Sequence, residues 1–388
     1  MRGTFERKNG IALIALVVTI IVLLILAGVS ITMLTGQNGI LNRAKEAKEN
    51  TEVAQAEEDE RMQRYEKIIN SYAENLPVGE GTTPYLPNST FSYKEGDLST
   101  GLVIKDSNDN EYVWVEVPTT IYTKNEYNNN GMNKPNSSSD YNQIEKCLKN
   151  YTADYSDANY GDTNLDFLES YQKMLKSVYE NGGFWIGRYE AGINVNRTAL
   201  GEATTIPVVK PNMYPYNYIT RNQAQKLSEE MNYDKCTSSL IFGLQWDLIL
   251  KHIEVKKISI DTEIKSKLKE DSKTIGNYKN NLWDITNPFA KYSNNYGSTF
   301  DNCPYKKENS EIVLLTTGAD KIFSIMNIYD LVGNVREWTL EFGTEDGPCV
   351  SRGGSYPNDG SSDVGSNHVI VSINRGDNDI GFRIGLWK

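Results

Sequence analysis

The hydrophobic positions of the chain begin with one long run that contains no charge. This run covers residues 11–34, IALIALVVTIIVLLILAGVSITML, and follows a ten-residue leader in which Arg2, Arg7 and Lys8 are basic. Roughly twenty apolar residues in a helix cover a hydrocarbon core of about 30 Å. A secretory signal peptide would have a shorter apolar region and a small-residue cleavage site at its end. The pattern therefore predicts a transmembrane helix at 11–34.

Hydrophobic positions after this run recur at near-helical spacing. Residues 38–75 contain no Pro, a single Gly and many good helix formers, with gaps in the apolar pattern in a charged middle part. We therefore expect the membrane helix to continue as an amphipathic stalk over residues 35–75. Residues 76–90, LPVGEGTTPYLPNST, hold three prolines and two glycines, which predict a linker. A globular domain is expected over residues 91–388.

The pattern within this domain predicts short strands and separate helices. Apolar and polar residues alternate over 101–118 on both sides of DSNDN, which indicates a β-hairpin, and residues 184–195 are typical of a buried strand. Helices are expected at 164–183, which a glycine ends, and at 220–232, where Thr220 can cap the N-terminus. Because strands and helices do not alternate as βαβ units, the fold class is α+β.

The remaining segments of the domain are less regular. Residues 240–255 form a third apolar element with Trp246 and Leu250 on one face. Residues 128–143 and 256–309 are polar, and we expect both to be loops.

Composition narrows the classes of partner. The net charge of -11 and the pI near 5.0 exclude a nucleic-acid partner, because phosphate binding needs a clustered basic face. Twenty-four Tyr against ten Phe favour a surface made for contact. The four cysteines form no CxxC pair, which argues against a zinc knuckle. Two disulfides in any of three connectivities and free buried thiols both remain open.

The N-terminal segment resembles type IV pilins and pseudopilins. A short basic leader, Gly10 directly before the apolar run and a long continuous helix carry this resemblance. It implies cleavage by a prepilin peptidase between Gly10 and Ile11 and assembly with other pilin-like subunits. The fifth residue of the mature chain is usually Glu in that family, whereas Ala15 stands here. The alternative is a plain single-pass anchor, and both interpretations place the domain outside a bacterial cell membrane.

The domain itself resembles the formylglycine-generating-enzyme and sulfatase-modifying-factor family over residues 111–388. The motifs are, in order, YVWVEVP, GFWIGRYEAGIN, SLIFGLQWDLILKHI, NIYDLVGNVREW, SRGGSY and IGFRIGL. The resemblance implies a C-type-lectin-like fold of the formylglycine-generating-enzyme type. Such enzymes hold copper with two cysteines between the RGGS and GFR motifs, and residues 356–380 contain no Cys. The related iron-dependent sulfoxide synthases need three histidines, and only His252 and His368 exist. We therefore expect no catalytic residues.

The NIYDLVGNVREW motif implies a structural calcium ion by the same resemblance. Carried onto this chain, the ligands are Asp330, the backbone carbonyls of Gly333 and Val335, and Glu337, all of them the oxygen donors that calcium prefers. The alternative is that Glu337 pairs with an arginine while Trp338 fills the core. Under either interpretation the motif is structural.

RGGS and GFR also suggest structural roles. Gly353 and Gly354 permit a tight backbone path. Arg352 and Arg383 are expected to bind buried carboxylates or carbonyls.

Residues 356–379 lie between these motifs and are almost all polar or small. A polar loop held by a rigid frame is a common way to present a binding surface. In the variable proteins of diversity-generating retroelements, which this domain resembles, the same interval is the hypervariable ligand surface. The alternative is an ordinary solvated loop. The candidate ligand-binding residues are Tyr356, Asn358, Asp359, Ser361, Asp363, Asn367, His368, Ser372, Asn374, Arg375, Asp377, Asn378 and Asp379.

The sequence thus predicts a membrane-anchored, surface-displayed and non-catalytic binding protein. Its ligand would be a cell-surface, phage or carbohydrate molecule bound through residues 356–379. The alternatives are a metal-dependent cysteine-oxidising enzyme with an unrecognised site and a structural minor pilin.

Overall fold

The computed structural model describes residues 15–28, 40–73, 76, 81–122, 135–156 and 167–388. The chain divides into two units, Met1–Tyr65 and Glu66–Lys388. The predicted leader, the cleavage-site residues Gly10 and Ile11, and both ends of the predicted membrane helix lie outside the described residues.

The first unit is helical where it is described. Residues 15–28 form a helix whose side chains are exposed, and α2 (Ile40–Ala73) lies within the predicted stalk. At a rise of about 1.5 Å per residue, the 34 residues of α2 extend over about 51 Å. Exposed pairs such as Lys45–Glu49 add a few tenths of a kcal/mol at most. Among the described residues, no helix combines the length and the apolar character needed to cross a membrane.

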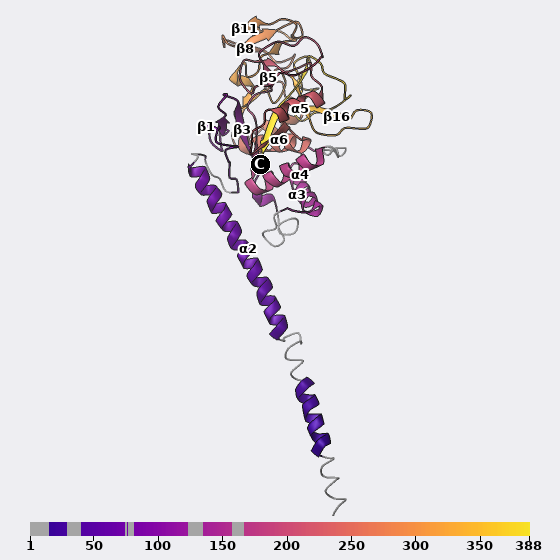
Figure 1. Ribbon diagram of the computed structural model, residues 1–388. Coiled ribbons are helices and arrows are strands. Elements are labelled where there is room, and N and C mark those ends of the chain that lie inside the picture. Colours follow the sequence, from indigo (N-terminus) through magenta and orange to yellow (C-terminus); the bar gives the residue numbers. More distant parts are fainter. Residues whose placement is uncertain (1–14, 29–39, 74–75, 77–80, 123–134, 157–166) are drawn as a thin grey trace, which may run out of the picture. The chain divides into compact units, whose positions relative to one another are not determined.

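The largest sheet of the second unit has six strands in the order β1-β2-β3-β4-β19-β7, and all its neighbours are antiparallel. Its strands β1 and β3 are labelled in Figure 1. The strands are β1 (Ser92–Glu95), β2 (Val103–Lys105), β3 (Glu111–Glu116), β4 (Gly183–Gly187), β7 (Thr237–Leu240) and β19 (Ile384–Trp387). β2 and β3 form the predicted hairpin. β19 lies between β4 and β7, with Gly385 opposite both Ile186 and Ser239.

Helices of this unit follow the predicted caps at two places. The helices are α3 (Ser138–Tyr151), α4 (Leu168–Asn181), α5 (Arg221–Glu230), α6 (Gly243–Lys257) and α7 (Ile264–Lys269). α4 ends at Gly182, which adopts the left-handed conformation at φ 67°, as the sequence predicts. The Thr220 side chain accepts a hydrogen bond from the Gln223 backbone N–H and caps α5, also as predicted.

Two predicted loops are partly regular, and these predictions were wrong. α3 begins inside the predicted loop 128–143, because Ser137 and Asp140 form a capping box and Ile144 and Leu148 are buried on the helix that follows. The predicted loop 256–309 contains α7, whose Ile264 and Leu268 belong to the main core, and four short strands, of which β8 contributes Trp283 and Ile285 to a small separate core. Elements of two to six residues are too short for periodicity to reveal.

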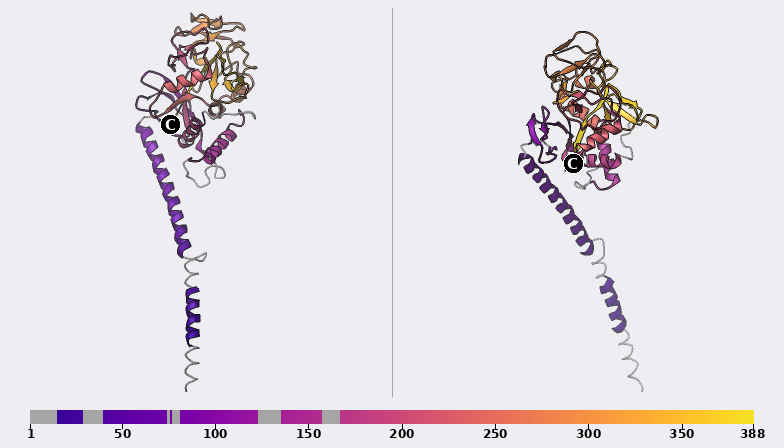
Figure 2. Two further views of the ribbon diagram at one scale, coloured as in Figure 1. Left: turned by 45° about the vertical axis from the view of Figure 1, so that its right-hand side comes forward. Right: turned by 45° about the horizontal axis from the view of Figure 1, so that its top comes forward.

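The other strands are short and form small sheets in the orders β10-β9-β12, β11-β8, β13-β14 and β5-β6. Their bounds are β5 (Gly192–Ile193), β6 (Tyr214–Pro215), β8 (Trp283–Ile285), β9 (Lys291–Ser293), β10 (Asp301–Asn302), β11 (Tyr305–Lys307), β12 (Leu314–Leu315), β13 (Ser324–Ile325) and β14 (Ile328–Tyr329). Single 3₁₀ turns are η1 (Thr119–Ile121) and η3 (Lys321–Phe323). β8 and β11 lie at the end of the unit away from α3 and α4, and both views in Figure 2 keep this arrangement. The fold is α+β, as predicted.

A four-stranded sheet in the order β17-β16-β15-β18 carries the C-terminal motifs. Its strands are β15 (Arg336–Thr339), β16 (Cys349–Arg352), β17 (His368–Val371) and β18 (Ile380–Phe382), and β15 runs parallel to β18. Residues 356–379 are therefore not one loop. They contain β17, which pairs with β16, because Val369, Ile370 and Val371 are β-branched.

Five tryptophans, Trp114, Trp185, Trp246, Trp338 and Trp387, are buried in the core of this unit. Full burial of one such ring stabilises the fold by roughly 4–6 kcal/mol at about 25 cal/mol per Å². One core therefore contains residues of both the six-stranded and the four-stranded sheet. This core fixes the four-stranded sheet to which residues 356–379 are attached.

Candidate ligand-binding site

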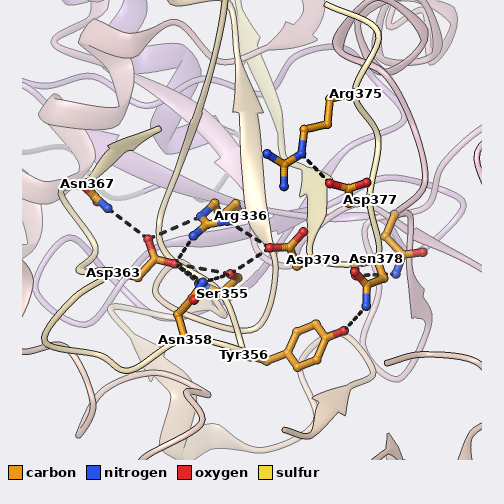
Figure 3. Close-up of polar contacts among 11 residues, drawn as sticks. Arg336, Ser355, Tyr356, Asn358, Asp363, Asn367, Arg375, Asp377, Asn378 and Asp379 are labelled. Atoms are coloured by element: carbon orange, nitrogen blue, oxygen red, sulfur yellow. Dashed lines mark hydrogen bonds and ion pairs between the residues drawn. The ribbon is translucent and has the colours of Figure 1, made fainter. Parts of the chain in front are cut away.

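Residues 356–379 are tied to the four-stranded sheet by Arg336, the first residue of β15 (Figure 3). Its Nη2 donates to Asp363 Oδ2 at 2.7 Å, and its Nη1 donates to Asp379 Oδ2 at 3.0 Å. The side chains of Asp363 and Asp379 are only 3% and 11% exposed. One guanidinium therefore holds both halves of the segment against the same strand.

Asp363 collects further donors from its own neighbourhood. Its carboxylate accepts hydrogen bonds from the Ser355 backbone N–H at 3.1 Å, from Asn358 Nδ2 at 2.9 Å and from Asn367 Nδ2 at 3.1 Å. Figure 3 shows these amides converging on the carboxylate. The sequence predicts Asn358 and Asn367 as ligand contacts, but in the structure their side-chain amides donate to Asp363 of the same segment.

The second half of the segment is fixed by Asp379 and Tyr356. Burial raises the pKa of the Asp379 carboxyl, and the nearby Arg336 and Arg375 lower it. The Tyr356 side chain is fully buried, and its hydroxyl accepts a hydrogen bond from Asn378 Nδ2 at 2.7 Å. Burial also raises the pKa of Tyr356, so the ring remains a neutral phenol.

The outward-facing members of the candidate set form a different group. Asp359, Ser361, Ser372, Asn374 and Arg375 are exposed. Arg375 pairs with the half-exposed Asp377. The side chains of Asp359, Ser361, Ser372 and Asn374 make no hydrogen bond within the described part of the chain. Exposed carboxylate, hydroxyl and amide groups of these residues are thus available to a partner.

His368 lies on β17 and is used inside the protein. Its Nδ1 is 2.6 Å from Glu341 Oε1, and its Nε2 contacts the guanidinium of Arg352. Arg352 also pairs with the fully buried Asp247 on α6. Burial raises the pKa of Asp247 to about 6 despite the opposing charge of Arg352. This cluster fastens β16 and β17 to α6.

The four residues of the predicted calcium site lie on and before β15. Glu337 is buried, and both its oxygens accept hydrogen bonds from Arg383. Asp330 Oδ2 accepts from the Gly318 backbone N–H at 2.6 Å, whereas its buried Oδ1 has no hydrogen-bond partner among the residues that the structure describes. The Gly333 backbone N–H donates to the Gly353 carbonyl, and the Val335 N–H donates to Glu190.

Burial and the closeness of other carboxyl groups disfavour the charged form of the acidic side chains here, so binding of a proton or a cation is favoured. Burial raises the pKa of Glu190 well above its ordinary value, and the charges of Asp330 and Glu337 raise it further. Burial likewise raises the pKa of Asp330 to about 7. Arg383 supplies one positive charge against these three carboxyls.

The structural roles of the RGGS and GFR motifs are confirmed. Arg352 binds Asp247 and Glu341, and Arg383 binds Glu337 and the carbonyls of Gly187 and Tyr329. Gly353 and Gly354 adopt φ of 96° and 77°.

Sequence reasoning missed the partners of these motifs, namely Arg336, Glu190, Asp247 and Glu341. Each stands inside or close to a quoted motif, and a charged residue among apolar neighbours, as in QWDLIL, was the available signal.

The described residues contain no group of three or more His, Cys, Asp or Glu side chains arranged to hold a metal ion. Cys147, Cys236, Cys303 and Cys349 form no disulfide in the structure, and Cys147, Cys303 and Cys349 are buried. Of the two interpretations that the spacing left open, the structure has thiols rather than disulfides.

Comparison with known proteins gave matches among solved structures. No protein-family model matches the chain, and no curated protein matches it. Among solved structures, the chain is similar to Treponema denticola variable protein 1, with 13% sequence identity and a TM-score of 0.26. The match covers 53% of this chain and 96% of the other.

Proposed function

We propose that this chain is a membrane-anchored, surface-displayed binding protein without catalytic activity. We call its globular domain, residues 91–388, the head. The head recognises a cell-surface, phage or carbohydrate ligand through the exposed side chains of residues 356–379. The fold of the head is that of the formylglycine-generating enzymes, a proposal that rests on the order of the six motifs.

The observation that carries this proposal is the division of residues 356–379 into two sets. Asp363, Asp379 and Tyr356 are buried and hydrogen-bonded to the frame. Ser361 and Asn374 are exposed and unengaged within the described residues. Side chains of the second set can be exchanged at little cost to folding, because exposed substitutions away from such networks usually change stability by less than about 0.5 kcal/mol. A frame of this kind suits a surface whose specificity is set by its outward residues.

The anchor is proposed from the N-terminal sequence. Residues 11–34 are uncharged and apolar, and residues 15–28 are helical with exposed apolar side chains. We propose that a prepilin-type peptidase cuts after Gly10 and that other pilin-like subunits are partners. A charge-free helix flanked by a stalk suits a single-pass anchor with the head outside the cell.

A binding experiment tests the proposed surface. The full chain in detergent micelles is applied to a glycan array, to a panel of bacterial cells and to a panel of phages. The test variant replaces Ser361, Ser372, Asn374 and Arg375 by Ala. The control variant replaces Lys226 and Glu230, an exposed pair on α5, by Ala.

The outcomes separate the candidate functions. Retention of one probe by the wild type and the control, with loss in the test variant, supports the proposal. Equal retention by all three proteins contradicts the proposed surface. Recovery of the chain in purified fibres, with no probe retained, favours a minor pilin. Metal-dependent oxidation of a cysteine peptide by the full chain would establish the enzyme alternative.

Resemblance to variable proteins motivates a population experiment. We propose that codons for residues 356–379 differ among cells of one growing population. Deep amplicon sequencing of codons 340–388 would then find substitutions at the exposed positions and none at Arg352, Gly353 or Arg383. A uniform sequence would remove the diversification proposal and leave a binder of fixed specificity.

A calcium ion at Asp330, Gly333, Val335 and Glu337 remains part of the proposal. The unpartnered Asp330 Oδ1 and the excess of buried carboxyls fit a hard cation. Glu337 already receives Arg383, so the ion would share that carboxylate. Calcium at 100 times its dissociation constant would stabilise the head by about 2.7 kcal/mol. Thermal melting with calcium, with magnesium and with a chelator tests this, and an Asp330→Ala variant should lose any calcium-specific shift.

A further inference from the structure

A surface pocket lies outside residues 356–379 and outside the proposed calcium ligands. Its volume is about 310 Å³, and its aromatic wall is made by Tyr189 and Tyr329. Pro211, Asn212, Asn287, Gly318, Asp320 and Lys321 line it together with Ala319. This volume is at the lower end of the range for small-molecule sites, roughly 300–1,000 Å³. The pocket therefore suits a ligand of about one ring.

The two aromatic rings are held rigidly. Their centroids are 5.0 Å apart with planes inclined by 37°. The guanidinium of Arg188 lies 5.7 Å from the Tyr189 centroid and 5.4 Å from the Tyr329 centroid. Arg188 is itself anchored by Glu111 at 2.8 Å. Rings fixed before a ligand arrives lose little conformational entropy when it binds.

Polar groups at the pocket complement this wall. Asn212 Oδ1 accepts a hydrogen bond from Asn287 Nδ2 at 3.1 Å, which orients the Asn212 amide. Asn212 Nδ2 donates to no group within the described residues and is free for a ligand. Asp320 Oδ1 accepts a hydrogen bond from the Ile322 backbone N–H at 3.0 Å, which leaves its Oδ2 as an acceptor beside the Lys321 donor. The opposite charges of these two residues give the pocket no net charge that would attract an ion.

The backbone at this position is also constrained. Asn212 adopts φ 61°, a left-handed conformation that few non-glycine residues occupy. The Met213 backbone N–H donates to Thr317 Oγ1 at 3.1 Å, which supports this turn. The conformation holds the Asn212 side chain at the pocket.

We propose that this pocket binds a neutral pyranose sugar. A pyranose has apolar C–H faces that pack on tyrosine rings, and hydroxyl edges that need paired donors and acceptors. Tyr329 supplies the partly exposed ring, Tyr189 beside it is 5% exposed, and Asn212, Asp320 and Lys321 supply the polar groups. This site is independent of the surface on residues 356–379, so either proposal can fail alone.

Saturation-transfer NMR on the full chain tests the proposal, in a detergent without a sugar headgroup. The probes are methyl glucoside, methyl galactoside, methyl mannoside and methyl N-acetylglucosaminide, with the acyclic polyol mannitol as control. We expect transfer to the ring C–H groups of at least one glycoside, a dissociation constant of about 1 mM and no transfer to mannitol. Tyr329→Ala should weaken binding about three- to tenfold.

Two further variants keep the test decisive. Asn212→Gly removes the free amide donor while glycine adopts the same left-handed backbone, so binding should weaken in a folded protein. Tyr93→Ala removes an exposed tyrosine of β1 outside the pocket, and binding should be unchanged. Absence of transfer to every glycoside overturns the proposal. Equal binding by the wild type, Tyr329→Ala and Asn212→Gly also overturns it, because the sugar would then lie elsewhere.

Discussion

Replacing Arg336 by methionine tests the frame that holds residues 356–379. The variant keeps much of the side-chain volume and removes the guanidinium that joins Asp363 and Asp379. Two carboxylates whose side chains are 3% and 11% exposed lose their charged partner. Removing one member of a buried ion pair costs about 3–5 kcal/mol, because the other charge stays buried.

The two carboxylates do not share this cost equally. Asp363 keeps donors from the Ser355 backbone and from two asparagine amides at 2.9 and 3.1 Å. Asp379 keeps one hydroxyl, Ser355 Oγ, at 3.4 Å and the attraction of the Arg375 charge. Most of the loss should therefore arise at Asp379. The double variant Arg336→Met, Asp379→Asn should recover at least half of it.

Urea denaturation of the full chain in micelles, followed by tryptophan fluorescence, measures these differences in the free energy of unfolding. In a separate thermal scan, a loss of 3–5 kcal/mol would lower the melting temperature by roughly 6–10 °C for a domain of this size. Arg375→Met is the matched control, because Arg375 pairs with Asp377 in the same segment but both side chains are exposed, at 43% and 44%. Its cost should be below about 1 kcal/mol. If Arg336→Met costs no more than Arg375→Met, Arg336 does not hold the segment.

Three further predictions concern the backbone, the buried acids and the N-terminus. Gly354→Ala should destabilise the head by about 2–4 kcal/mol, since φ is 77° and an added Cβ would lie 2.1 Å from the Asp363 carbonyl oxygen. Melting curves measure this loss. The control is Gly201→Ala, where an added Cβ has nothing within 4 Å and the melting temperature should stay near that of the wild type. The pKa of Asp330 is raised by burial from 3.8 to about 7, so the folded state holds the proton more tightly and stability from this group falls as pH rises from about 4 to about 7. Asp330→Asn should therefore be more stable than the wild type at pH 7.5 and similar at pH 4 in urea titrations without calcium, and a parallel pH dependence in both proteins would contradict this. Mass spectrometry of the protein from a host with a prepilin peptidase should find Ile11 as the first residue, and Gly10→Val should retain the leader.

Elements with strong local signals could be predicted from the sequence. Thr220 with Gln223 caps α5, and Gly182 ends α4, because capping depends on residues within one turn of each other. The hairpin of β2 and β3 follows from alternation around a turn. The α+β class follows from the same local patterns.

Elements that depend on distant partners could not be predicted. β8 pairs with β11 over three residues each, and their strand character arises from the small core around Trp283. β17 lies in an otherwise polar segment, where three β-branched residues are too few to reveal a strand without its pairing with β16. Short strands carry too few residues for a periodic signal.

Residues 356–379 illustrate the same limit at the site. Composition indicates a polar surface, but it cannot separate Asp363, which faces Arg336, from Asp359, which faces solvent. That difference depends on Arg336, which lies on another strand and was not assigned a role from the sequence. The pocket at Tyr189 and Tyr329 escaped prediction because it unites residues from five separate segments.

The position of β19 has a consequence for how the head is made. β19 pairs with β4 on one edge and with β7 on the other, although both neighbours are synthesised much earlier. The six-stranded sheet cannot close until residues 384–387 have left the ribosome, so the facing edges of β4 and β7 stay open until then. A premature stop codon before β19 would leave β4 and β7 without the strand that joins them. Residues 356–379 lie directly upstream of this closing strand, so a frameshift there removes β19 while a substitution leaves it in place.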